Sequence, residues 1–360
     1  MPFRTQIYRS LPLWNVVLKR LGIEQSLERA ATRIEVLQPE ETEEVPPAVS
    51  LPGQLDLVRG VTSHDTLAHQ VALAKQTVFH HAALTKYTIR DCVVADHGVE
   101  FLAGSMRKRR LRRADMQVAP MTEESSAHYC MSTVSHTYFG HFLTDSCPKA
   151  LLASEEQALL LDINPAWPHA AQYADVFRLA PAPPLPRLVR RLTILRDHGQ
   201  GSNKRARYDE MRTRIAERFG PTGSATERVF LRRGGGGKAR LLAREDALTE
   251  TLAARGFRIV DMDGLDLQAL ADSLRHARTV VTVEGSHVNH VHFLAPRGFD
   301  LCVLMPDDRT TFVHRGLANA FGGRFGYLVC PREGEGYRAS ATSILKTLDL
   351  MEDARSMVRH

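Results

Sequence analysis

Two stretches of the sequence carry side chains whose types and spacing could do chemistry. In the first, Gly140-His141-Phe142 is followed by Asp145. On a helix, residues four apart lie on one face with Cβ atoms roughly 5–6 Å apart, so the Asp145 carboxylate could orient the His141 imidazole. A histidine and a carboxylate placed in this way can transfer a proton to or from a substrate. The same pair would also suit a buried structural histidine that a neighbouring carboxylate satisfies.

The second stretch is TVVTVEGSHVNHVHFLAPRG at 279–298. The β-branched residues 279–283 predict a buried strand, and apolar residues at helical spacing predict a helix over 286–294. Gly285 permits a tight turn between them, and Ser286 can cap the helix. A helix that begins at the carboxyl end of a central strand directs free N–H groups toward the crevice where nucleotides bind in open α/β sheets. The pattern therefore predicts a phosphate site, although such turns occur in most α/β domains.

The elements around the second stretch alternate regularly. The predicted strands are 228–231, 257–260, 279–283 and 300–305, and the predicted helices are 244–255, 267–277 and 286–294. Alternation of this kind predicts a parallel, doubly wound sheet. The N-terminal half is less regular, with strands predicted at 91–95 and 99–103 and helices at 138–152 and 169–178.

Length and composition limit the class of protein. The chain has 360 residues, enough for two domains, and its 43% hydrophobic and 24% charged residues are typical of a globular protein. No apolar run reaches the roughly 20 residues that span a bilayer, and no secretory signal is evident. The five cysteines are scattered and lack CxxC spacing, which argues against a disulfide framework or a zinc site. We therefore expect a cytoplasmic protein.

Two features suggest contact with a charged surface. Residues 107–113 contain six positive charges in seven positions. An anionic lipid surface, a polyanionic acceptor or nucleic acid could bind them, and a solvated loop kept from aggregating by its charge is an equal alternative. The absence of zinc-finger and RNP-type motifs argues against nucleic acid. Within residues 1–21, an apolar helical face lies beside Lys19 and Arg20, as in peripheral interfacial helices, although a face that packs on the core or a partner is more common. The apolar residues of that face are Leu13, Trp14, Val17, Leu18 and Leu21.

Taken together, the motifs resemble glycosyltransferase family 61, especially its bacterial polysaccharide-assembly branch. The resemblance covers roughly residues 90–305. It rests on Gly140-His141-Phe142 with Asp145, on an Arg-Arg strand end with later basic and acidic residues, and on a Glu-Gly-Ser turn followed by Pro-x-Gly. The matching residues of the last two motifs are Arg232, Arg233, Arg240, Glu245, Asp246, Glu284, Gly285, Ser286, Pro296 and Gly298. This chain departs from the family in having four glycines at 234–237 and a histidine, His287, after the Glu-Gly-Ser turn.

The resemblance implies an α/β, GT-B-like architecture in which two Rossmann-like domains face each other across a cleft. We expect an N-terminal arm and acidic, proline-rich linker at 1–56, an acceptor-side domain at 57–190, a domain at 191–340 that binds a nucleotide sugar, and a final helix at 341–360. The implied reaction inverts the anomeric carbon without an essential metal or other cofactor, and it uses a nucleotide-sugar donor, which we expect to be UDP-linked. The implied product is a growing surface glycan such as capsule, lipopolysaccharide or exopolysaccharide.

The residues make chemical sense of this reaction. Asp145 is the first candidate for the base that deprotonates the acceptor and His141 the second, with the other group then acting as its orienter. Basic side chains and the helix start can stabilise a departing nucleoside diphosphate. The expected donor-binding residues are Arg232, Arg233, Lys238, Arg240, Glu284, Gly285, Ser286, His287, Asn289 and His290. Because a carboxylate beside a diphosphate would be repelled, we expect Glu284 to face the sugar or ribose hydroxyls.

Other interpretations compete with this one. The glycines at 234–237 lack the flanking residues of a P-loop, and neither Asp261-Met-Asp263 nor the histidines at 287–292 form a convincing metal site. A different polysaccharide-modifying transferase, such as a pyruvyl transferase, could use the same basic residues. A non-catalytic protein that binds a membrane or polyanion through 107–113 is the third reading. We expect nucleotide sugar and glycan acceptor as partners, with peripheral contact to an anionic membrane through 1–21 or 107–113 at its inner face, and no nucleic acid.

Overall fold

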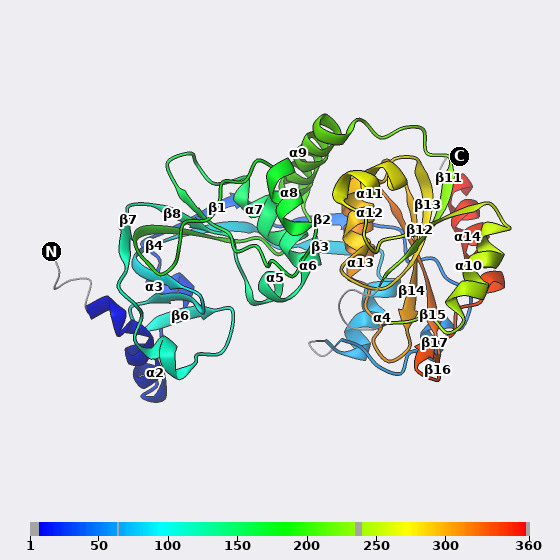
Figure 1. The fold of residues 1–360 in the computed structure, drawn as a ribbon. Coiled ribbons are helices and arrows are strands. Elements are labelled where there is room, and N and C mark those ends of the chain that lie inside the picture. Colours follow the sequence, from blue (N-terminus) through cyan, green and yellow to red (C-terminus); the bar gives the residue numbers. More distant parts are fainter. Residues whose placement is uncertain (1–6, 63–64, 235–239, 358–360) are drawn as a thin grey trace. The chain divides into compact units, whose positions relative to one another are not determined.

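The computed structural model describes residues 7–62, 65–234 and 240–357 and divides the chain into two units (Figure 1). Unit 1 consists of Met1–Glu41 and His81–Gly199, and unit 2 of Thr42–His80 and Gln200–His360. The sequence suggested a boundary near residue 190 and placed residues 57–80 in the first domain. The structure instead assigns 42–80 to unit 2. The α/β class is confirmed, because both units combine sheets with helices.

Unit 2 contains the parallel sheet that the strand-helix alternation predicted. Its five strands lie in the order β12-β11-β13-β14-β15, and all four pairings are parallel. Their bounds are β11 Glu227–Arg232, β12 Phe257–Asp261, β13 Ala277–Val283, β14 Asp300–Pro306 and β15 Arg324–Cys330. Strands β13 and β14 are buried along almost their whole length, as expected for central strands covered on both faces.

Helices cover both faces of this sheet (Figure 1). On one face, α10 and α14 pack against each other, α10 against β12 and α14 against β14 and β15. On the other face, α12 packs on β13 and α13 on β15, while α11 and α9 pack against α12. The bounds are α9 Ser202–Phe219, α10 Glu245–Ala253, α11 Leu267–Leu274, α12 Val288–Leu294, α13 Val313–Ala320 and α14 Ala341–Met357. A short hairpin, β16 Arg332–Glu333 with β17 Gly336–Tyr337, follows β15.

The acidic, proline-rich segment after residue 38 is part of unit 2 for most of its length. Val49 bonds to the outer edge of β15, accepting from the Tyr327 amide at 3.0 Å and donating to the Phe325 carbonyl at 3.0 Å. Arg315 of α13 donates to the Pro46 carbonyl of this segment and to the carbonyls of Leu73 and Gln76, which come later in the chain. The expectation of a free linker is therefore wrong for residues 42–56, because backbone bonding along a sheet edge has no compositional signature. The elements here are β2 Glu41–Glu44, η1 Gln54–Leu57, α4 Leu67–Lys75 and β3 Val78–His81, with β2 paired to β3.

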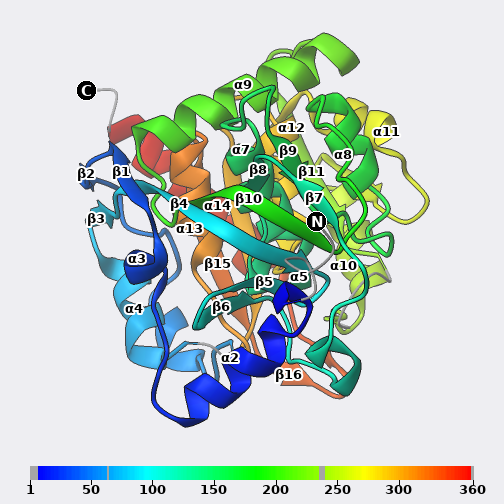
Figure 2. The same cartoon turned by 90° about the vertical axis from the view of Figure 1, so that its left-hand side faces the viewer.

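Unit 1 differs from the expected Rossmann-like domain. Its eight-stranded sheet has the order β6-β5-β4-β10-β8-β9, with β1 paired to β4 and β7 to β10. The two longest strands, β4 and β10, run antiparallel side by side (Figure 2). A two-residue turn at 96–97 joins β4 to β5, and so short a connection permits only antiparallel pairing. The bounds are β1 Arg33–Gln38, β4 Leu84–Ala95, β5 Gly98–Phe101, β6 Gly104–Arg107, β7 Thr122–Glu124, β8 Ala127–Tyr129, β9 Ala158–Leu160 and β10 Arg187–Arg196.

The helices of unit 1 are short. They are α2 Leu11–Arg20, α3 Leu27–Ala30, η2 Arg113–Met116, α5 Thr133–Thr137, α6 Phe139–His141, η3 Phe142–Ser146, α7 Cys147–Ala150 and α8 Ala170–Val176. All five cysteines of the chain are buried free thiols. Among the described residues, no helix is both long enough and apolar enough to cross a bilayer.

Candidate functional site

The strand order of unit 2 identifies the edge where a ligand would bind. The chain leaves β11 for β12 on one side and then crosses to β13 on the other side of β11. In open α/β sheets, ligands bind at the carboxyl ends of the two strands that flank such a reversal. Strand β11 ends at Arg232 and β13 at Val283, so the predicted Arg-Arg and Glu-Gly-Ser motifs meet at this edge.

The turn after β13 differs in detail from the predicted helix start. Helix α12 begins at Val288, two residues later than expected, and Ser286 does not cap it. The amides of 288–290 donate to the carbonyls of 285–287, so they are already used within the turn. The amides of 285–287 have no carbonyl partner in the described part of the chain. Three backbone donors therefore remain at this edge, but they belong to the turn rather than to the helix.

A glycine is required at position 285 because neighbouring side chains lie close to its backbone. Its φ is not in the left-handed region. A Cβ at this position would lie 2.9 Å from His287 Nδ1 and 3.1 Å from Arg240 Nη1, tighter than ordinary packing contacts. A glycine therefore lets an arginine and a histidine approach the backbone directly after β13.

Hydrogen bonds of the neighbouring threonine fix the protonation of His287. Thr282 Oγ1 donates to the Leu231 carbonyl at 2.7 Å, so at 2.8 Å it can only accept from His287 Nε2. Burial, with the charges of Arg233, His314 and Arg240, lowers the pKa of His287 well below its usual value. The imidazole is therefore neutral, and its Nδ1 is a buried acceptor with no hydrogen-bond partner among the described residues. Thr282 was not predicted, because nothing in a β-branched strand distinguishes one threonine.

Three arginines surround one carboxylate at the same edge. Arg240 forms a buried ion pair with Glu284 and donates to the Glu284 carbonyl at 2.6 Å. Burial raises the pKa of Glu284, and the charges of Arg240, Arg309 and Arg233 oppose that rise. Burial and the charge of Arg240 lower the pKa of Arg233 to about 10, which leaves Arg233 protonated at neutral pH. Three arginine side chains therefore act on the charge of this one carboxylate.

The position of Glu284 adds a partner that was not predicted. Its carboxylate forms a buried ion pair with Arg240, and its contact with sugar or ribose hydroxyls stays a prediction. Arg309, which lies in the loop after β14, was not predicted because it is far from both motifs in the sequence. Its Nε is buried without a hydrogen-bond partner in the described chain. We call Arg233, Arg240, Arg309, Glu284 and His287 the arginine cluster.

Several predicted donor residues lie outside this cluster. Arg232 pairs with Glu245 at 3.4 Å and Asp246 at 3.2 Å, the acidic residues that begin α10. Lys238 lies outside the described residues. Asn289 and His290 are buried within α12, where the Asn289 side chain donates to the Ser286 carbonyl at 2.9 Å. Their role in donor binding stays a prediction.

The first motif forms the expected pair in unit 1. His141 Nδ1 lies 2.7 Å from Asp145 Oδ2, and both side chains are partly exposed. The predicted continuous helix is interrupted between them, since 142–146 form a π turn. Such insertions widen one helical turn and are frequent at functional sites. The wider turn also rotates the residues that follow it, and Lys149 is buried. The neighbours Phe142 and Leu143 are fully buried and anchor the segment.

Unit 1 also has a pocket that was not predicted. Its volume is about 350 Å³, and its lining includes Lys108, Tyr129 and Asp162. Lys108 Nζ lies 2.6 Å from Asp162 Oδ2, and His136 Nδ1 lies 3.3 Å from the same oxygen. Pro181, Ala182, Pro183 and Leu185 also line this pocket. A second pocket of about 360 Å³ among α9, α11 and α12 contains none of the predicted donor residues.

The described residues contain no group of three or more His, Cys, Asp and Glu side chains that could bind a metal ion. Arg232 approaches Asp261 at 3.9 Å, so that carboxylate contributes to the ion pairs at the end of β11.

The parallel sheet and its basic edge define unit 2 as an α/β domain suited to an anionic ligand. Comparison with known families identifies the chain more closely. Residues 139–303 match the model of the family described as Glycosyltransferase 61. This region of the chain is therefore similar to glycosyltransferase family 61, in agreement with the resemblance of its motifs. The matched region includes His141 and Asp145 and extends into β14. No curated protein matches the chain.

Proposed function

We propose that this chain is an inverting, metal-independent glycosyltransferase that moves a sugar from a UDP-linked donor to a growing surface glycan. The observation that carries the proposal is the arginine cluster at the strand-order reversal of unit 2, in a chain that is similar to a glycosyltransferase family. We place the reaction in the cytoplasm, where the five buried thiols stay reduced.

The cluster suits the leaving group of such a transfer. When the bond between the anomeric carbon and the diphosphate breaks, negative charge develops on the diphosphate. Arg233, Arg240 and Arg309 can stabilise that charge through charge-assisted hydrogen bonds, and the amides of 285–287 can add neutral donors. His287 Nδ1 accepts and cannot donate, so it suits a hydroxyl of the donor rather than a phosphate oxygen.

The pair in unit 1 suits the other half of the reaction. The acceptor hydroxyl must lose its proton as its oxygen attacks the anomeric carbon opposite the diphosphate. Asp145 occupies His141 Nδ1, which leaves Nε2 as the nitrogen that can take this proton. We therefore propose His141 as the base and Asp145 as its orienter, reversing the order of preference that the sequence alone suggested.

The cluster can be tested by calorimetry with UDP. Arg309→Gln should weaken UDP binding at least tenfold, because one charge-assisted contact contributes about 1.5–3 kcal/mol. Arg278→Gln is the matched control, since Arg278 of β13 pairs with Glu352 on the surface of the same unit. Arg232→Gln should have a smaller effect than Arg309→Gln, because Arg232 already pairs with α10. Equal UDP affinity of Arg309→Gln, Arg233→Gln and the wild type would show that the phosphates of UDP bind elsewhere.

The competing reactions need a different substrate test. A pyruvyl transferase would consume phosphoenolpyruvate, whereas a glycosyltransferase should slowly hydrolyse its nucleotide sugar when no acceptor is present. Release of inorganic phosphate from phosphoenolpyruvate without release of free sugar from a nucleotide sugar would refute the proposed reaction while leaving a phosphate-binding role for the cluster.

A further inference from the structure

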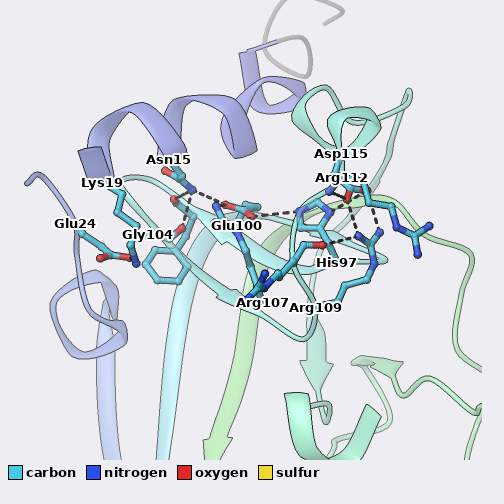
Figure 3. A network of polar contacts seen from close by, with 12 residues as sticks. Asn15, Lys19, Glu24, His97, Glu100, Gly104, Arg107, Arg109, Arg112 and Asp115 are labelled. Carbon is cyan, nitrogen blue, oxygen red and sulfur yellow. Dashed lines mark hydrogen bonds and ion pairs between the residues drawn. The ribbon is translucent and has the colours of Figure 1, made fainter. Parts of the chain in front are cut away.

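The face of helix α2 that packs on unit 1 is partly polar. Leu11, Pro12 and Asn15 are its buried residues. The Asn15 amide donates to Glu100 Oε2 at 2.7 Å, to the Phe101 carbonyl at 3.0 Å and to the Gly104 carbonyl at 2.7 Å. The face that packs on the β5–β6 hairpin is thus anchored by a polar side chain (Figure 3).

A polar network fixes this helix and the basic segment to the same hairpin (Figure 3). Glu100 is fully buried and accepts from Arg107 Nε at 2.7 Å as well as from Asn15. Burial alone would raise the pKa of Glu100, but the hydrogen bonds from His97, Arg107 and Asn15 outweigh it and keep that pKa below its ordinary value. Asp115 of η2 pairs with Arg109 at 2.6 Å. Because α2 also packs against η2, the two form one surface element.

The outward side of α2 is apolar. Leu13 is 45% exposed, Trp14 56%, Val17 37% and Leu21 68%. At 100° per residue these four lie within an arc of about 100° opposite Asn15. Arg20 follows Leu13 by seven residues and therefore lies at the edge of the arc. The apolar face predicted from the sequence exists, but four of its five members face away from the core.

The basic run divides into two sets. Arg107, Lys108 and Arg109 pair with Glu100, Asp162 and Asp115 inside unit 1. By contrast, Arg110, Arg112 and Arg113 are exposed, and in the described part of the chain no carboxylate pairs with them. Three uncompensated cations therefore lie at η2 or directly before it, on the element against which α2 packs.

We propose that α2 and η2 form a docking surface for an anionic lipid membrane. Leucine, valine and tryptophan side chains of the arc enter the interface between headgroups and acyl chains, where the amphipathic indole of Trp14 is favoured. Arg20 and the three exposed arginines bind the anionic headgroups. The positive charge of this surface favours a membrane over a second copy of the chain, because two copies of the same basic surface would repel each other. The inference does not depend on the transfer reaction.

Sedimentation of the full chain with vesicles tests this surface. Vesicles of equal amounts of phosphatidylglycerol and phosphatidylcholine should bind the chain, and vesicles of phosphatidylcholine alone should bind it far more weakly. Replacing Arg110, Arg112 and Arg113 by Gln should reduce binding about fivefold for each charge removed. The matched control replaces three exposed arginines of unit 2, Arg255, Arg258 and Arg338, and should bind like the wild type.

The apolar arc is tested with one charged substitution. Val17→Glu should lower partitioning of the chain onto vesicles by at least about tenfold, because it removes a valine side chain that the lipid interface would bury. Val36→Glu is the control, since Val36 is 63% exposed on β1. If Val17→Glu fails to fold, as judged by circular dichroism, Leu21→Ser takes its place. The proposal is overturned if the wild type does not bind anionic vesicles or if Val17→Glu and Val36→Glu bind alike. A wild-type dimer that Val17→Glu dissociates, with vesicle binding unchanged, would overturn it in favour of a second copy.

Discussion

Arg240 and Glu284 form a buried ion pair in which the guanidinium also donates to the Glu284 backbone carbonyl at 2.6 Å. The Arg240 guanidinium thus holds the turn after β13 through both the side chain and the main chain of Glu284. It also leaves Arg233 and Arg309 as the charges that Glu284 does not directly pair with. The carboxylate thus limits the positive charge of the cluster without cancelling it.

Removing the carboxylate should destabilise unit 2. Glu284→Gln leaves Arg240 buried beside two other cations, and breaking a buried pair in this way costs about 3–5 kcal/mol of unfolding free energy. Glu227→Gln breaks an exposed pair with Arg258 and should cost less than about 1 kcal/mol. Urea unfolding of both variants measures the difference. Equal losses would show that the Arg240 and Glu284 pair is not buried in solution.

Adding one methyl group at Gly285 should damage the ligand site more than the fold. The Cβ of Gly285→Ala would displace His287 and Arg240 from the turn. We expect UDP affinity to fall about tenfold and the unfolding free energy to fall by about 1–3 kcal/mol. Gly316→Ala is the control, because its Cβ would meet Phe79 at an ordinary 3.8 Å within α13 and should slightly stabilise that helix. Unchanged UDP affinity in Gly285→Ala would show that the turn is not part of the UDP-binding site.

Stability should fall as the pH drops below 6.5, in part because of His292. This side chain is fully buried, stacks on Phe321, and has no hydrogen-bond partner for either nitrogen among the described residues. Burial and the charge of His314 lower its pKa well below 6.5. The unfolded chain therefore takes up a proton below pH 6.5 that the folded chain does not, and stability that is complete above pH 6.5 is lost toward the folded pKa. His292→Phe should reduce this dependence by up to about 1.4 kcal/mol per pH unit, measured by urea unfolding at pH 7.5 and 5.5. An unchanged slope would mean that His292 is hydrated or protonated in the folded chain.

The regular part of the fold could be predicted because each of its signals is local. Strand 279–283 and the helices around it follow from β-branched runs and helical spacing, and β13 and α12 match these predictions to within two residues. The sequence could not predict the contacts of Val49 with β15 or the mixed sheet of unit 1, because strand pairing depends on residues distant in the sequence.

The same limit applies to the candidate site. The pair of His141 and Asp145 was predictable because helical spacing alone brings the two side chains together. Arg309 and Thr282 were not predictable, since Arg309 acts on Glu284 and Thr282 donates to the Leu231 carbonyl, and both partners are distant in the sequence. The ion pair of Glu284 was likewise hidden, so its charge was assigned to a sugar contact. The facing arrangement of the two domains across a cleft stays a prediction.

Transfer by the Asp145→Asn variant tests the central claim most directly. The wild type and the variant are each given a panel of UDP-sugars, with donor binding measured by calorimetry and release of UDP measured over time. Binding should be equal, because Asp145 belongs to unit 1 and the arginine cluster to unit 2. UDP release should fall by about 10²–10⁴-fold, because His141 loses the carboxylate that orients it as a base. Near-normal UDP release by Asp145→Asn, or a wild type that binds no UDP-sugar, would contradict the account.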